Sequence, residues 1–194
     1  MLTLLLFFIS ITVAYVLGSL CSAVIVSQVF KLPDPRASGS NNPGATNVLR
    51  LAGKKYAAFV LLGDFLKGLL AVWLASIMHL GSFAQGLVGL AAVLGHVYPV
   101  FFEFKGGKGV ATTLGVFFGI QPMLGFMAII IWGLVAYLSR YASLASIIAV
   151  TVTPFLQSHG TSTCVPLFFI AMLVVYQHRH NIIRLREGNE SKLK

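Results

Sequence analysis

Long apolar runs make up most of this chain, and nearly all of its charged residues fall in the short segments between those runs. Of the 194 residues, 57% are hydrophobic and 10% are charged, whereas a soluble domain carries roughly 25% charged residues. A helix that spans a bilayer needs ~20 mainly apolar residues. We therefore expect an all-α, polytopic integral membrane protein that forms one helical bundle, with residues 1–194 as a single domain.

The number of sufficiently apolar runs sets the expected number of membrane spans. The run 110–120 is the weakest, because it reaches a spanning length only with part of the flanking glycine-rich stretch. Without it the number of spans falls to six. We predict seven spans, near residues 2–30, 56–80, 83–102, 110–120, 123–138, 143–157 and 164–177.

The distribution of lysine and arginine favours seven spans, because cytoplasmic loops carry an excess of both residues. The connections near Gly81, Gln121 and Gly160 contain neither, and no charged residue precedes Lys31. This pattern predicts an N-terminus in the periplasm or outside and a cytoplasmic C-terminus. The basic residues follow the first, third, fifth and seventh spans: Lys31, Arg36, Arg50, Lys54, Lys55, Lys105, Lys108, Arg140, Arg179, Arg184, Arg186, Lys192 and Lys194.

One ionisable pair lies within an apolar run. Asp64 and Lys67 are three residues apart and so share a helix face, at a position where a charge costs at least ~2.5–3.5 kcal/mol. The simpler interpretation is mutual neutralisation near the cytoplasmic interface, with the Lys67 side chain reaching toward water. The alternative is that Asp64 positions basic residues of the loops.

Several classes of protein lack support in the sequence. The net charge of +9 lies in short blocks rather than along a soluble face, which argues against nucleic-acid binding. Five acidic residues are too few for a two-metal phosphotransfer site, and no GxSxG elbow occurs. We expect neither a metal nor a cofactor. Cys21 and Cys164 lie inside apolar runs, and we interpret them as small apolar residues.

The first polar segment, SGSNNPGATNVLR at residues 38–50, is rich in small residues, amides and hydroxyls. Successive backbone N–H groups in such turns form anion-binding nests, and a helix beginning near Thr46 would add partial positive charge. Arg50 supplies a bidentate fork suited to phosphate. The segment therefore predicts a phosphate-binding loop, with a solvated turn as the simpler alternative.

Three further polar segments follow later spans and should meet the first at the cytoplasmic face. GHVYPVFFEFKGGKGVATTLG, residues 95–115, combines glycines with Lys105 and Lys108, and His96 precedes it near a helix end. Gly109 follows Lys108, so the segment is not a Walker A loop. SRYASLAS, residues 139–146, and HRHNIIRLR, residues 178–186, add hydroxyl, amide and basic groups. We predict one anion site at this face.

These four segments resemble the bacterial acyl-phosphate-dependent glycerol-3-phosphate acyltransferases, and the likeness extends over nearly the whole chain. The resemblance implies a seven-helix enzyme of the bacterial inner (cytoplasmic) membrane with its active site facing the cytoplasm. It implies that an acyl group passes from acyl phosphate to the 1-hydroxyl of glycerol 3-phosphate, giving lysophosphatidic acid and inorganic phosphate. The implied partners are these two substrates, the lipid bilayer and the enzyme that produces the acyl phosphate.

The resemblance also implies roles for individual residues. The acyl-phosphate pocket would use Ser40, Asn42, Gly44, Thr46, Asn47 and Ser143. Glycerol 3-phosphate would be held by Arg50, Lys105, His178 and Asn181. No dedicated side-chain base is expected, since the phosphate of the donor would accept the hydroxyl proton, with His96, Lys108 and Ser143 in supporting roles.

Two positions depart from the family pattern. Asn41 stands where the family has glycine; because asparagine tolerates the left-handed conformation, we expect the turn to be kept. Glu103 also replaces a common glycine, and its carboxylate should weaken anion binding unless it pairs with a nearby cation.

A small organophosphate transporter would use the same cations and glycines. Transporter sites lie near the bilayer midplane and often between repeats, whereas these polar groups gather at one face and no internal repeat is visible. The transporter is therefore the second hypothesis.

Overall fold

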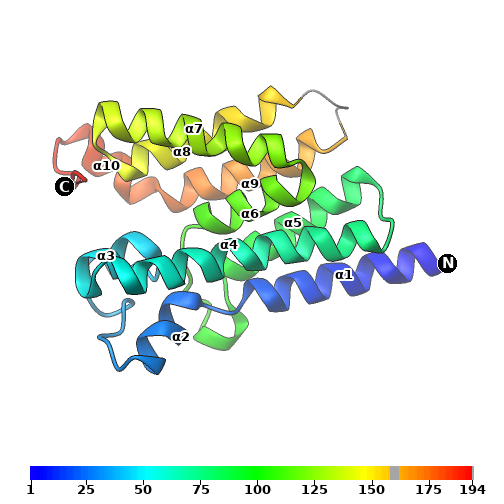
Figure 1. Cartoon of the computed structure of the whole chain (residues 1–194), viewed down its shortest axis with the longest axis horizontal. Helices are drawn as coiled ribbons and strands as arrows, with labels where there is room; N and C mark the ends of the chain where they lie inside the picture. Colours follow the sequence, from blue (N-terminus) through cyan, green and yellow to red (C-terminus); the bar gives the residue numbers. More distant parts are fainter. Residues whose placement is uncertain (158–161, 194) are drawn as a thin grey trace.

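A computed structural model describes residues 1–157 and 162–193, and within them the chain is helical, without a β-strand (Figure 1). The longer helices lie roughly along one common axis and form a single bundle. Their bounds are α1 Leu2–Gly18, α2 Ser22–Val29, α3 Ala45–Ala52, α4 Lys54–Ile77, α5 Ser82–Val97, η1 Val100–Phe102, α6 Val110–Ile120, α7 Pro122–Ser139, α8 Ala142–Val152, η2 Thr153–Leu156, α9 Cys164–Gln177 and α10 Arg179–Arg186.

Each of the seven apolar runs contains a helix, although not all are long enough to cross a bilayer alone. Among the described residues, three helices, α4, α5 extended through η1, and α7, are long and apolar enough. The pair α1 and α2 makes a fourth if the two are taken as one bent span. The connection near Gly160 and the terminal Lys194 lie outside the described residues.

The expectation of one continuous helix over residues 2–30 is wrong. The chain breaks after Gly18, and α1 and α2 meet at an angle of 44°. The run 83–102 likewise ends its α-helix at Val97 and continues as the short 3-10 helix η1. Helix α6 begins and ends where the apolar pattern predicts, but its 11 residues extend only about 16 Å. It therefore covers about half of the ~30 Å hydrocarbon core.

Glycines allow the central helices to approach each other closely, as is common in membrane bundles. A Cβ atom on Gly18 of α1 would lie 2.2 Å from the Ala92 carbonyl oxygen of α5. A Cβ on Gly115 of α6 would lie 2.0 Å from the Phe65 oxygen of α4. Gly68 of α4 approaches Thr112 of α6, and Val72, further along α4, approaches Gly119, further along α6. Helices α4 and α6 therefore run parallel.

The Asp64–Lys67 pair is buried inside the bundle, so the expectation that Lys67 reaches toward water is wrong. The lysine side chain is 5% exposed, and its Nζ lies 3.0 Å from Asp64 Oδ1. The same Nζ donates a hydrogen bond of 2.9 Å to the Leu20 carbonyl, in the break between α1 and α2. Asp64 also faces His96 of α5, with Oδ1 and Nδ1 3.4 Å apart, rather than a basic residue of a loop.

Substitution of Gly115 by alanine should destabilise the bundle, because the added Cβ meets backbone of α4 that cannot move independently. Overpacking of this kind costs about 1–3 kcal/mol, which corresponds to a fall in Tm of several degrees in a chain of this length. Thermal unfolding in detergent measures the change. Gly133→Ala in α7 is the matched control, since nothing lies within 4 Å of its Cβ position. Equal Tm values for the two variants would contradict the close-packing argument.

Candidate functional site

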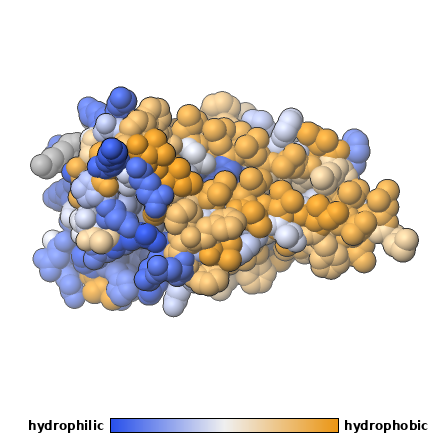
Figure 2. Space-filling model, turned by 90° about the horizontal axis from the view of Figure 1, so that it is seen from below, coloured by the Kyte–Doolittle hydropathy of each residue, from blue (hydrophilic) through white to orange (hydrophobic). Residues whose placement is uncertain are grey.

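The hydrophilic surface of the molecule gathers at one end of the bundle (Figure 2). This is the end where α3 and α10 lie, opposite the N-terminus of α1 (Figure 1). The side of the molecule that faces the viewer in Figure 2 is largely apolar away from this end, as expected for a lipid-facing surface. The four polar segments of the sequence therefore come together at one end, and this polar end is the candidate site.

The first loop, residues 38–50, is organised around the buried amide of Asn47. Its Nδ2 donates to the carbonyls of Pro35 and Ser38, at 3.0 and 2.9 Å, and its Oδ1 accepts from the Ser40 N–H at 3.0 Å. Because all these contacts are to backbone, the Asn47 amide holds the shape of the loop. Its place in the acyl-phosphate pocket stays a prediction. Asn41 has a φ of 56°, so the left-handed turn is kept.

The groups of this loop that remain available lie around the beginning of α3. Ser40, Thr46 and Arg50 are exposed, and Asn42 and Gly44 are half-buried. None of the side chains of Ser40, Asn42, Thr46 and Arg50 donates a hydrogen bond to another group in the described part of the chain. Helix α3 begins at Ala45, close to the predicted start at Thr46, so unpaired backbone N–H groups add partial positive charge there.

The second segment folds back onto the end of α5. The Gly107 N–H donates to the His96 carbonyl at 3.1 Å, and a Cβ on Gly106 would lie 2.0 Å from that same oxygen. Glu103 and Phe104 have positive φ values of 56° and 57°, which reverse the chain after η1. The resulting glycine loop, residues 106–109, leads directly into α6.

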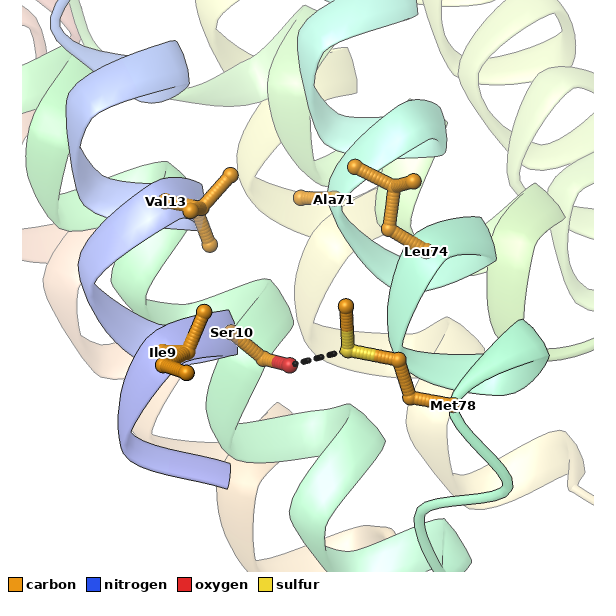
Figure 3. A pocket seen from close by; sticks show the side chains of 7 residues that line it. Ile9, Ser10, Val13, Ala71, Leu74 and Met78 are labelled. Atoms are coloured by element: carbon orange, nitrogen blue, oxygen red, sulfur yellow. Dashed lines mark hydrogen bonds between the residues drawn. The ribbon is translucent and has the colours of Figure 1, made fainter. Parts of the chain in front are cut away.

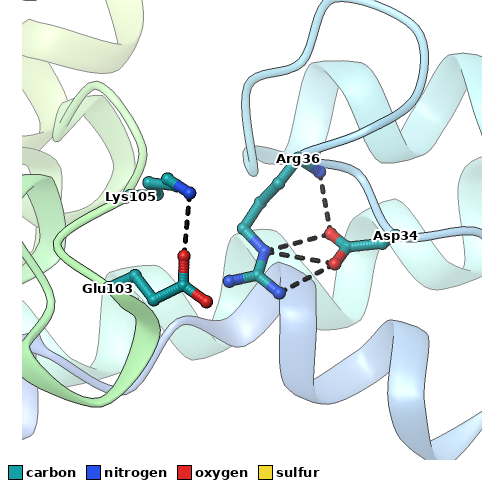
Figure 4. Close-up of polar contacts among 4 residues, drawn as sticks. All are labelled: Asp34, Arg36, Glu103 and Lys105. Carbon is teal, nitrogen blue, oxygen red and sulfur yellow. Dashed lines mark hydrogen bonds and ion pairs between the residues drawn. The ribbon is translucent and has the colours of Figure 1, made fainter.

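Two ion pairs face each other where the residues just before the first loop meet the second segment (Figure 4). Arg36 Nη2 lies 2.8 Å from Asp34 Oδ2, and Lys105 Nζ lies 2.8 Å from Glu103 Oε2. Hydrogen bonds from Arg36 lower the pKa of Asp34, and the contact with Lys105 lowers the pKa of Glu103. The Glu103 carboxylate is thus paired with Lys105. Such a pairing is the condition under which we expected it not to weaken anion binding.

The remaining site residues meet at Glu190, which the sequence interpretation missed. Its Oε1 accepts hydrogen bonds from Ser143 Oγ at 2.7 Å and from Asn181 Nδ2 at 2.6 Å. Its Oε2 accepts from Arg184 Nε at 2.7 Å. Lys108 Nζ donates to the Oδ1 of the same Asn181. Glu190 is one of only five acidic residues in the chain. This scarcity is the feature of the sequence that could have pointed to Glu190.

Burial and neighbouring groups shift the pKa values of two side chains in this cluster, Lys108 and Glu190. It lowers the pKa of Lys108 to about 8, where neighbouring Arg184 and Arg50 act in the same direction and Glu190 opposes them. Burial raises the pKa of Glu190, but the hydrogen bonds from Asn181, Ser143 and Arg184 outweigh it and leave that pKa below its ordinary value.

His178, between α9 and α10, is neutral at pH 7. Burial lowers its pKa to about 4, and its Nδ1 lies 2.8 Å from the Val174 carbonyl oxygen. Since a carbonyl only accepts, Nδ1 carries the proton and Nε2 presents a lone pair. His178 can therefore accept a hydrogen bond from a ligand hydroxyl.

The small cavity at the other end of the bundle does not fit an anion (Figure 3). It lies between α1 and α4, encloses about 20 Å³, and is lined by Ile9, Ser10, Val13, Ala14, Ala71, Leu74 and Met78. Its hydroxyl, Ser10 Oγ, donates to the Leu6 carbonyl and contacts Met78 Sδ at 3.2 Å. Within the described residues, no group of three or more His, Cys, Asp and Glu side chains could hold a metal ion.

Glu190→Gln should lower the free energy of unfolding by about 2–3 kcal/mol, because hydrogen bonds to a charged group contribute about 1.5–3 kcal/mol. It should also speed hydrogen–deuterium exchange across the C-terminal tail, residues 187–193. Thermal unfolding and exchange measured by mass spectrometry test both effects. Glu187→Gln, at an exposed carboxylate of the same tail, is the control. A Glu190→Gln variant as stable as this control would show that Glu190 does not hold the cluster together.

Comparison with known proteins identifies relatives along almost the whole chain. Residues 8–188 match the model of a family described as glycerol-3-phosphate acyltransferase. A glycerol-3-phosphate acyltransferase of Coxiella burnetii is 46% identical over 190 residues, covering 97% of this chain and 98% of the relative. One from Legionella pneumophila is 48% identical over 192 residues, covering 97% of this chain and 69% of the relative.

Two crystal structures share the fold. Both are of PlsY (YgiH), described as an integral membrane glycerol 3-phosphate acyltransferase. The glycerol 3-phosphate form has a TM-score of 0.91 and 39% identity, covering 97% of this chain and 96% of that one. The lysophosphatidic acid form has a TM-score of 0.89 and 38% identity, covering 97% and 95%.

Proposed function

This chain belongs to the glycerol-3-phosphate acyltransferase family, and from its polar end we propose the reaction that it catalyses. It is a membrane acyltransferase that moves an acyl group from acyl phosphate to the 1-hydroxyl of glycerol 3-phosphate. The products are lysophosphatidic acid and inorganic phosphate, in the first step of bacterial phospholipid synthesis. The observation that carries the proposal is the gathering of Arg50, Lys105 and Lys108 with neutral donors at one end of an apolar bundle.

The first loop is the proposed site of the acyl phosphate. Ser40, Asn42 and Thr46 offer uncharged donors, and Gly44 allows the backbone to approach the ligand. The N-terminus of α3 favours a phosphate at this point. Asn47 takes part indirectly, because its three backbone hydrogen bonds hold the loop in shape. The acyl chain of the donor extends from this loop into the bilayer.

The second site, for glycerol 3-phosphate, combines Arg50 and Lys105 with His178 and Asn181. Lys105 is exposed and must exchange Glu103 for the substrate phosphate, an exchange favoured by the weakness of surface ion pairs. Lys108 holds the Asn181 side chain and supplies further positive charge. The neutral His178 accepts a hydrogen bond from a substrate hydroxyl through Nε2. Ser143 lies at the same cluster, where its Oγ contacts Glu190.

In the proposed reaction the 1-hydroxyl oxygen forms a bond to the acyl carbon, and the bond between that carbon and the phosphate oxygen breaks. The hydroxyl proton leaves with the phosphate, so atoms and charge balance without a side-chain base. A His178 with a pKa of about 4 is a weak base at neutral pH, which supports this route. The chain contributes orientation of the two substrates and cationic stabilisation of the developing charges. His96 supports the reaction through the loop beside it.

The membrane arrangement follows the same proposal. Seven membrane segments cross the bacterial inner membrane as one domain, with the N-terminus outside and the polar end in the cytoplasm. The clustering of lysine and arginine at the polar end supports this orientation. The short helix α6 completes its crossing through the glycine loop, which enters the bundle from the polar end. The enzyme that produces the acyl phosphate is the proposed protein partner.

Purified protein supplied with palmitoyl phosphate and glycerol 3-phosphate, without metal, should form lysophosphatidic acid and inorganic phosphate in equal amounts. Palmitoyl-CoA in a parallel reaction should give little product, because its acyl carbon is joined to sulfur and so carries no adjacent phosphate for the proposed donor site to bind. Mass spectrometry of the lipid and a colorimetric phosphate assay measure both products. Turnover with palmitoyl-CoA alone would overturn the proposed donor.

Arg50→Ala and Lys105→Ala test the assignment of the acceptor site in the same assay. Each should lower kcat/KM for glycerol 3-phosphate by about 100-fold, equivalent to about 2.7 kcal/mol. Lys54→Ala, which removes an exposed cation at the start of α4, is the control. Normal kinetics in both site variants would show that Arg50 and Lys105 do not bind glycerol 3-phosphate.

The KM for glycerol 3-phosphate should rise at alkaline pH as Lys108 loses its proton. Because burial lowers the pKa of this ammonium to about 8, the cation is present below that pH and lost above it. A rise of about tenfold by pH 9 is expected. Lys108→Arg keeps its charge at every pH in this range and should move the rise to higher pH. An unchanged alkaline profile in that variant would assign the effect to another group.

A further inference from the structure

Three ionisable side chains are buried together beneath the glycine loop. Asp64 and Lys67 come from α4, His96 comes from α5, and each of the three is at most 5% exposed. Burial of an ionisable residue inside a membrane bundle costs free energy, and such residues usually have a function. None of the three reaches the surface of the polar end, so their role must pass through what they contact.

Asp64 is the centre of this group. Its Oδ1 lies 3.0 Å from Lys67 Nζ and 3.4 Å from His96 Nδ1. Both Asp64 Oδ1 and His96 Nδ1 are buried, and neither has a hydrogen-bond partner in the described residues, so the contacts between the three side chains are electrostatic. The Asp64 carboxylate therefore faces the Lys67 ammonium and a His96 ring nitrogen. Each of these two side chains links Asp64 to a different irregular segment of the chain.

The first link leads from His96 to the glycine loop. The His96 carbonyl accepts the Gly107 N–H at 3.1 Å, and a Cβ on Gly107 would lie 2.2 Å from His96 Nε2. The backbone and ring of His96 thus form the surface on which residues 106–107 lie. Lys108 follows directly in the chain, so its position depends on this surface.

The second link leads from Lys67 to the break in the first apolar run. Its Nζ donates to the Leu20 carbonyl at 2.9 Å, where α1 ends and the chain turns by 44° into α2. A carbonyl at a helix end has no intrahelical partner, and in hydrocarbon it must find one within the protein. Lys67 satisfies it, and Asp64 balances the charge of Lys67.

We infer that Asp64 is a positioning residue for the acceptor site, holding His96 and, through it, the glycine loop that carries Lys108. The inference rests on the proposed function. Both nitrogens of the His96 ring face protein groups, Asp64 on one side and Gly107 on the other. The ring therefore acts as a support for the loop and does not transfer a proton to or from substrate.

The double variant Asp64→Asn/Lys67→Met tests this role without leaving one buried charge uncompensated. The apparent KM for glycerol 3-phosphate should rise at least tenfold, while the KM for palmitoyl phosphate stays within twofold. Hydrogen–deuterium exchange at residues 103–109 should become at least tenfold faster, with residues 164–177 unchanged. Thr153→Val, which removes a buried hydroxyl remote from the site, is the matched control and should alter neither quantity.

His96→Asn provides the second measurement and leaves the ion pair intact, so it serves even where the double variant fails to fold. It should speed exchange at residues 103–109 and raise the same KM. Combining it with the double variant should add no further effect, because both act on one link. It should also leave the pH dependence of kcat unchanged, whereas a proton-transferring His96 would lose one limb of that profile.

The outcomes separate this inference from the proposed function. Wild-type protein that does not turn over glycerol 3-phosphate would refute the function, and exchange at residues 103–109 would still test the positioning. Unchanged exchange and KM in folded Asp64→Asn/Lys67→Met would overturn the inference. Independent, multiplicative effects of the two changes would overturn the route through His96.

Discussion

Every break in a helix of this bundle needs an internal partner for the backbone groups that it frees, because hydrocarbon offers none. The break after Gly18 has its Leu20 carbonyl bound by Lys67. The end of α5 has its His96 carbonyl bound by the Gly107 N–H. Both contacts lead to Asp64 of α4. The irregular segments that build the polar end are therefore anchored to a regular, buried helix.

Charge balance shapes the polar end in a similar way. Four acidic side chains are each paired with a cation: Asp34 with Arg36, Asp64 with Lys67, Glu103 with Lys105, and Glu190 with Arg184. Arg50 and Lys108 form no ion pair among the residues that the structure describes. These two cations are thus available to a phosphate without exchange of a carboxylate. The exposed Lys105 requires such an exchange, and its surface location makes that exchange easy.

Close helix packing and short helices together decide where the site lies. Gly68 and Gly115 bring α4 and α6 into backbone contact. Because α6 has only 11 residues, the glycine loop must enter the bundle to reach its first turn. Lys108 is consequently half-buried and its pKa falls, while Lys105, three residues earlier, is exposed. Two lysines of one motif thus lie in different surroundings, one half-buried and one exposed.

The helical class, the apolar runs and the polar segments could be predicted from the sequence alone, because hydrophobic run length and charge placement are local properties. The bounds 110–120 and 164–177 were correct, and the start of α3 was placed within one residue. The bend in the first run and the roles of individual residues depend on contacts between distant segments, which a local sequence pattern does not contain. The bend after Gly18 depends on Lys67 and Leu20, which are 47 residues apart. Glu190 became central only when Ser143 and Asn181 converged on it, and Asn47 became a loop support once its neighbours were placed. Contacts between distant segments set these roles, since burial and hydrogen-bond partners exist only in the folded bundle.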